Sequence, residues 1–121
     1  MEAIVVRPDP GSEYPTDERC SILESWNRPG DPAVSVARAR VAPGESTRPH
    51  RLRDVIERYV IVEGLGAVTL GDAAEKRVVP GDNVVIPAGV SQSIRNTGPR
   101  DLVFYCVCTP RFTPDCYESL D

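Results

Sequence analysis

The chain has 121 residues, of which 40% are hydrophobic and 26% charged, and a net charge of −4. This composition predicts one globular domain over residues 1–121. Nucleic-acid binders carry a basic surface, and a membrane span needs ~20 consecutive apolar residues, so we expect neither a nucleic-acid nor a membrane partner. The N-terminus lacks the apolar stretch of a signal peptide, which predicts a cytoplasmic protein. Four cysteines without a C-x-x-C pair predict free thiols.

Short runs rich in valine and isoleucine follow one another along the chain, separated by glycine, proline, aspartate and asparagine. Residues 3–7 are the first expected strand, and a polar, proline-rich connector covers 8–18. The further expected strands are 19–26, 33–42, 57–63, 66–71, 75–79, 83–87, 91–96 and 101–108. Many short strands with turn signals between them predict an all-β sandwich or barrel. The one candidate helix is 114–119, which begins at a proline.

Two segments carry glycines at fixed distances from polar residues. Residues 44–64, GESTRPHRLRDVIERYVIVEG, contain Gly44, His50, Glu57 and Gly64, and residues 81–96, GDNVVIPAGVSQSIRN, contain Gly81, Pro87, Gly89 and Asn96. These eight positions match the two sequence motifs of the cupins, so the chain resembles a small single-domain cupin. The resemblance implies a double-stranded β-helix, which is a jelly-roll barrel with little helix. The barrel core would cover residues 33–109, with N-terminal strands and a loop over 1–32 and a C-terminal tail over 110–121.

The resemblance also points to a metal site. In metal-binding cupins, two histidines and a glutamate of the first motif and a histidine of the second hold a divalent ion. The matching positions here are His50, Leu52, Glu57 and Gln92. His50, Glu57 and Gln92 are therefore the candidate ligands for Fe, Mn, Zn or Ni. Leucine cannot ligate and an amide oxygen is a weak donor, so this set would bind a metal less tightly than three imidazoles.

Alternate side chains of a strand share one face, which extends the candidate site into a pocket. Its predicted walls are Tyr59, Ile61, Ile94, Phe104, Cys106 and Cys108. A mostly apolar pocket with a few polar groups is typical of a small-molecule site. Arg38 and Arg40 share a face of the strand before the first motif, where a solvated surface is the simpler explanation and a carboxylated ligand the alternative.

Three functions fit these residues. The first is a metal-dependent dioxygenase, isomerase or lyase that acts on a small polar molecule. The second is a small-molecule-binding protein without turnover. The third is a metal-free enzyme in which His50 or Glu57 is the general base, as in sugar-nucleotide epimerase cupins. The sequence does not decide between an enzyme and a binder, and it assigns no catalytic residue. Open sheet edges also predict a homodimer.

Overall fold

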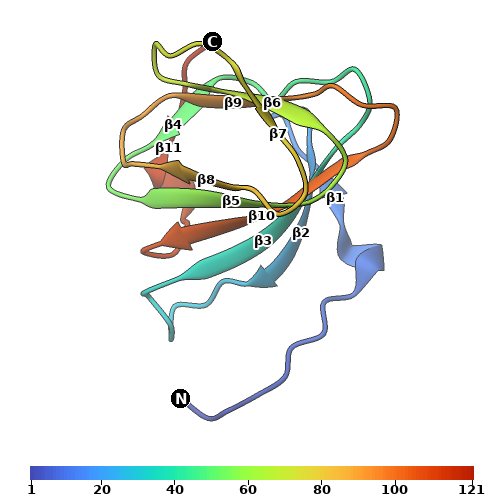
Figure 1. Ribbon diagram of the computed structural model, residues 1–121. Helices are drawn as coiled ribbons and strands as arrows, with labels where there is room; N and C mark the ends of the chain where they lie inside the picture. The colour runs from blue at the N-terminus through green and yellow to red at the C-terminus, as the bar shows by residue number, and fades with distance from the viewer.

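Two antiparallel β-sheets face each other in the computed structural model, which describes residues 1–121 (Figure 1). One sheet has six strands in the order β1-β2-β3-β10-β5-β8, and the other has five in the order β11-β4-β9-β6-β7. The strands are β1 (Tyr14–Pro15), β2 (Ser21–Trp26), β3 (Ser35–Val41), β4 (His50–Leu52), β5 (Ile56–Glu63), β6 (Gly66–Leu70), β7 (Lys76–Val78), β8 (Asn83–Ile86), β9 (Gln92–Asn96), β10 (Leu102–Thr109) and β11 (Tyr117–Ser119). The predicted all-β jelly-roll barrel is confirmed.

The only helical elements are two single turns of 3-10 helix, η1 (Pro10–Ser12) and η2 (Pro114–Cys116). The helix predicted over 114–119 is therefore wrong, because the chain leaves η2 directly into β11. There, Tyr117 lies opposite Leu52 of β4. The strand predicted over 3–7 is also wrong: no other strand pairs with this segment, and its Val5 side chain is 88% exposed. No helix in the structure has the length and hydropathy needed to cross a membrane.

Aliphatic and aromatic side chains fill the space between the sheets. The largest buried side chains include Phe104, Ile61, Ile86, Ile94 and Leu102, each at most 2% exposed. Burying one such side chain contributes about 1.5–3 kcal/mol, so this cluster dominates the stability of the barrel. Strand β10 pairs with both β3 and β5 and forms the centre of the six-stranded sheet.

The motif glycines act as turn devices. Gly64 ends β5 with a positive φ of 81°, and a Cβ at this position would lie 2.5 Å from the carbonyl oxygen of Asp101. A side chain is excluded there by both the backbone conformation and the close approach of the neighbouring chain.

The polar residues of the two motifs come from both sheets. His50 of β4 lies opposite Gln92 of β9 in the five-stranded sheet. Glu57 of β5 lies opposite Cys108 of β10 in the six-stranded sheet. All four side chains are buried. The barrel therefore holds a polar group between its sheets, beside an otherwise apolar core.

Candidate functional site

A cavity of about 180 Å³ opens into the barrel between the two sheets. Its floor comes from β3, β4, β5 and β10, and its rim from β2, the segment before β2 and the C-terminal tail. His50 and Glu57 both line it, and so does Leu52. The first sequence motif therefore supplies the polar floor of the cavity.

The His50 ring is held in one orientation by three neighbours. Its Nδ1 lies 2.9 Å from the carbonyl oxygen of Arg48 and 3.6 Å from a carboxylate oxygen of Glu18. Its face stacks on Tyr117, with ring centroids 5.0 Å apart. An Nδ1–H that donates to Arg48 leaves the lone pair of the neutral ring on Nε2, which has no hydrogen-bond partner in the protein. Nε2 is thus the nitrogen available for chemistry.

Glu57 is a buried carboxyl group with one unsatisfied oxygen. The residue is 7% exposed, its Oε2 accepts a hydrogen bond from the Cys108 thiol at 3.6 Å, and its Oε1 has no partner. Burial raises the pKa of Glu57, while the nearby His50 ring opposes this and the Glu18 carboxylate adds to it. Its proton is therefore held to higher pH than that of a solvated glutamate, which suits a general acid.

The other predicted site residues divide between the cavity and the core. Tyr59 lines the cavity, and its hydroxyl donates a hydrogen bond to Oε1 of Gln92. Gln92 itself is 2% exposed and does not line the cavity. Ile61 and Ile94 also pack in the apolar core and do not reach the cavity, which corrects their assignment as pocket walls. The period of a strand gives the inward face but not the depth at which the cavity ends.

The row predicted on β10 does line the cavity. Phe104, Cys106 and Cys108 all contribute to its wall, and so does Cys20, which immediately precedes β2. All four cysteines of the chain are free. Burial raises the pKa of Cys20 to about 11 and raises those of Cys106 and Cys108 as well. The thiolate is the nucleophilic form, so these cysteines act as small apolar groups.

Comparison with known proteins agrees with the motif and the fold. Residues 37–108 match the family model of the cupin domain. The chain belongs to the cupin family. Over 87 residues it is 33% identical to the uncharacterized protein MJ1618 of Methanocaldococcus jannaschii. This alignment covers 72% of this cupin and 69% of MJ1618.

Solved cupin structures share the fold at low identity. One of them is the Streptomyces protein Pac13, a nucleoside dehydratase. A structure of a Pac13 variant with uridine matches with a TM-score of 0.78 and 13% identity, and the match covers 98% of this chain and 92% of Pac13. The cupin domain of Schizosaccharomyces pombe Cnp3 matches with a TM-score of 0.70 and 17% identity. That match covers 78% of this cupin but only 66% of the Cnp3 chain.

The metal-ligand positions of this cupin do not form a metal-binding set. Leu52 occupies one of them and is 3% exposed, so an apolar side chain fills the space of a ligand. The amide oxygen of Gln92 already accepts the Tyr59 hydroxyl. No three His, Cys, Asp or Glu side chains are arranged to hold a metal ion. One imidazole and one carboxylate are too few ligands of the types that bind Fe, Mn, Zn or Ni, so the donors do not fit these ions.

Much of the rim lies outside residues 37–108 and escaped the sequence interpretation. The segment treated as a connector contributes Tyr14, Thr16 and Glu18, and the tail contributes Phe112 and Tyr117. A signal was present, because every second residue from 14 to 24 lines the cavity, which is the period of a strand. Prolines and charges in this segment masked that alternation.

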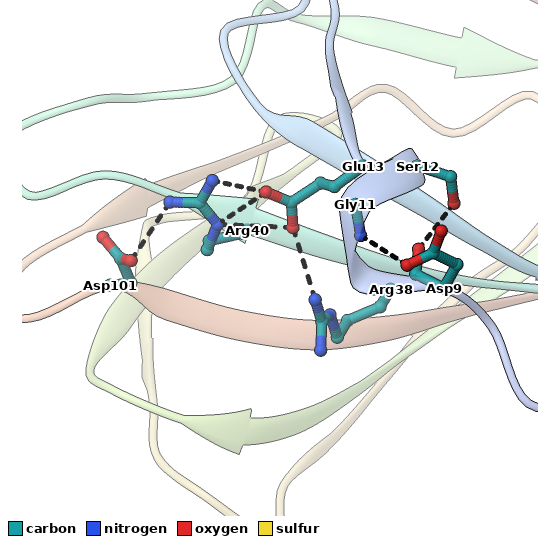
Figure 2. Close-up of polar contacts among 7 residues, drawn as sticks. All are labelled: Asp9, Gly11, Ser12, Glu13, Arg38, Arg40 and Asp101. Carbon is teal, nitrogen blue, oxygen red and sulfur yellow. Dashed lines mark hydrogen bonds and ion pairs between the residues drawn. The ribbon is translucent and has the colours of Figure 1, made fainter.

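Arg38 and Arg40 lie on the outer face of β3, as the simpler explanation predicted. Arg40 contacts Glu13 through Nε at 3.1 Å and Asp101 at 3.2 Å, and Arg38 contacts Glu13 at 3.4 Å (Figure 2). This network fastens the N-terminal segment to the sheet just before Tyr14. The arginines therefore support the rim of the cavity from outside and do not contact its contents.

Proposed function

We propose that this cupin is a metal-free isomerase or lyase that moves protons on a small polar molecule, with His50 and Glu57 as its acid–base pair. One observation carries the proposal: a buried carboxyl with an unpartnered oxygen lines the same cavity as an oriented imidazole with a free Nε2. An unsatisfied buried acceptor costs about 1–3 kcal/mol, which makes it a poor choice for stability and a suitable group for a substrate.

The chemistry follows from the environment of each group. Nε2 of His50 removes a proton from a carbon beside a carbonyl or similar activating group. Glu57, whose raised pKa favours the protonated form, gives its proton to the atom that gains electrons. In a dehydration the C–O bond breaks and this proton leaves with the hydroxyl as water. Glu18, 3.6 Å from Nδ1, stabilises the imidazolium until solvent returns the protons to their starting positions.

The comparison with Pac13 supports an elimination as the reaction. Pac13 is a nucleoside dehydratase, and dehydration is an elimination that needs one base and one acid. A dioxygenase would need a redox-active metal, which the donors at positions 50, 52, 57 and 92 do not fit. Binding without turnover is the competing function, and the same experiment separates the two.

The proposal is tested by proton exchange in D₂O. We expect the wild-type protein to incorporate deuterium into members of a panel of small hydroxy-carbonyl compounds and nucleosides, followed by NMR. His50→Asn and Glu57→Gln should each slow exchange by about 10²–10⁴-fold. Glu75→Gln is the matched control, because Glu75 pairs with Arg95 on the outer surface.

Three outcomes of this experiment would contradict the proposal. Exchange that stops after dialysis against a chelator and returns with an added metal would show a metal-dependent enzyme. A compound that binds without exchange or conversion would favour the binder. Equal exchange in wild type and Glu57→Gln would remove Glu57 from the chemistry.

The predicted homodimer and cytoplasmic location remain proposals. Exposed apolar side chains on the N-terminal segment, Ile4, Val5 and Val6, are 57%, 88% and 40% exposed, and they favour a second copy as the partner. Light scattering coupled to size exclusion tests this: we expect a dimer in the full chain and a shift toward monomer in a Val5→Asp variant. A monomeric full chain would contradict the dimer.

A further inference from the structure

The cavity concentrates the aromatic residues of the chain and excludes its basic ones. Both phenylalanines and three of the four tyrosines line it: Tyr14, Tyr59, Phe104, Phe112 and Tyr117. None of the 14 lysines and arginines does. The ionisable side chains on the wall, other than thiols and tyrosines, are His50 and three glutamates, Glu18, Glu24 and Glu57.

Three of the six glutamates outside the cavity have arginine partners. Glu13, Glu75 and Glu118 each form an ion pair with at least one arginine. Of the three cavity glutamates, only Glu18 has an ion-pair partner, which is the single histidine at 3.6 Å. One oxygen of the deepest, Glu57, is buried with no partner at all. The wall is thus acidic and aromatic, and none of its carboxyl groups is paired with an arginine.

Glu18 lines the cavity, and its side chain is 29% exposed. Its Oε2 lies toward His50, while Oε1 makes no hydrogen bond to the protein. Tyr117 stacks on the His50 ring, and Glu18 lies 3.6 Å from Nδ1 of the same ring, so both residues are neighbours of His50. A carboxylate beside aromatic rings attracts a cation in two ways, by charge and by the negative faces of the rings.

We propose that the cavity binds a small organic cation, an amine whose ammonium group is held by Glu18 among the rim aromatics. This deepens the proposed function by naming the substrate class of the same site, and it rests on that site. Glu57 and His50 remain free for the reaction, since the ammonium group is held at Glu18 and Glu57 is the more buried carboxyl. An anionic substrate, such as a carboxylate or phosphate, would meet three glutamates and no guanidinium, which costs it affinity.

The volume limits the size of the amine. A cavity of about 150 Å³ holds a benzene ring, so ~180 Å³ admits one ring or a short chain with a small substituent. Benzylamine, benzyl alcohol and benzoate have nearly the same shape and carry a positive, zero and negative charge at neutral pH. They therefore separate the effect of charge from the effect of shape.

The test measures the affinity of these three probes for the full-length protein by calorimetry. We expect benzylamine to bind at least about tenfold more tightly than benzyl alcohol, and benzoate more weakly than both. Glu18→Gln should remove the advantage of benzylamine and leave benzyl alcohol unchanged. Glu75→Gln, which removes the same charge from the outer surface, should leave all three affinities unchanged. The melting temperature of each variant checks that it is folded.

Three results would overturn the inference. They are benzoate or benzyl alcohol binding as tightly as benzylamine, a benzylamine affinity that Glu18→Gln does not change, and no benzylamine binding up to about 10 mM, which corresponds to less than ~3 kcal/mol.

The failure of the proposed function gives a different result. If Glu57→Gln abolishes proton exchange but keeps the affinity for benzylamine within about threefold, both proposals stand. Selective amine binding without any proton exchange would contradict the proposed enzymatic function and support the proposed amine ligand. Exchange that depends on His50 and Glu57 but favours anionic compounds would sink the ligand class and keep the enzyme.

Discussion

Strand β3 separates two carboxyl environments. On its outer face, Glu13 lies between Arg38 and Arg40, and the hydrogen bond from Arg40 lowers the pKa of Glu13 (Figure 2). On its inner face, Ala37 and Ala39 line the cavity that contains Glu57, whose pKa is raised by burial. The pKa values of these two glutamates, which lie a few strands apart, are thus shifted in opposite directions.

The difference shows that Glu13 contributes to stability, whereas Glu57 lowers stability at the candidate site. Arg38 and Arg40 neutralise Glu13, and these partly exposed ion pairs support folding. Glu57 is buried without an arginine partner, and its Oε1 has no hydrogen-bond partner. Buried polar groups without hydrogen-bond partners are expected mainly at functional sites. The contrast between Glu13 and Glu57 can be tested from both sides.

The largest effect is expected on activity, at the inner glutamate. Glu57 acts as a general acid, so the rate should fall as pH rises through its raised pKa. In Glu57→Gln this fall in rate with rising pH should disappear, and the rate should be about 10²–10⁴-fold lower than that of wild type. A pH–rate profile of wild type and variant measures both. A rate that instead rises over this range would make Glu57 the base.

The second effect is a gain of metal binding when the missing ligand is restored. Leu52→His places a second imidazole beside His50 and Glu57, completing three ligands of the types that hold zinc or nickel. We expect affinity for Zn²⁺ to increase on the order of 10²-fold or more over wild type in calorimetry. Arg77→His, which adds a histidine on exposed β7, is the control for adventitious binding. Wild type with one tightly bound ion per chain would contradict the metal-free site.

The third effect is on stability. Because the folded state holds the Glu57 proton more tightly than the unfolded chain, stability should fall as pH rises from the ordinary value near 4.5 to the raised folded pKa. Glu57→Gln cannot lose a proton there, so at neutral pH we expect it to be about 1–3 kcal/mol more stable than wild type. The two proteins should be alike at pH below 4.5. Urea unfolding across this range measures the difference, and a less stable variant at neutral pH would contradict it.

The smallest effect is expected at the outer glutamate, with the opposite pH dependence. Arg40→Gln removes the contacts to Glu13 and Asp101, and since these are partly exposed we expect a loss of at most about 1 kcal/mol. The pKa of Glu13 is lowered in the folded state, so this contribution is present above pH 4.5 and is lost as pH falls through the lowered value. Arg77→Gln, which removes an arginine without an ion pair, is the matched control. A loss that persists in acid would indicate packing in place of charge.

The sequence predicted the barrel well because its evidence was local. Spaced glycines such as Gly64 are required by backbone geometry, and valine-rich alternation is required by burial, so both are visible in the chain itself. The strand predicted at 3–7 failed because a run rich in valine and isoleucine indicates only that a segment can pair, and no strand of the fold pairs with it. The 114–119 segment failed because its proline starts only a single turn before β11 pairs with β4.

For the site, the sequence supplied the candidates and the fold selected among them. The motif determined that His50 and Glu57 share the barrel and that Leu52 replaces a ligand. Only the tertiary structure decided that Gln92 accepts a hydrogen bond from Tyr59 and that Ile61 and Ile94 lie in the core and do not line the cavity. It also decided that Glu18, from a distant segment, contacts His50. These facts depend on which strands meet across the barrel and how deeply each side chain sits, and neither is encoded in the period of one strand.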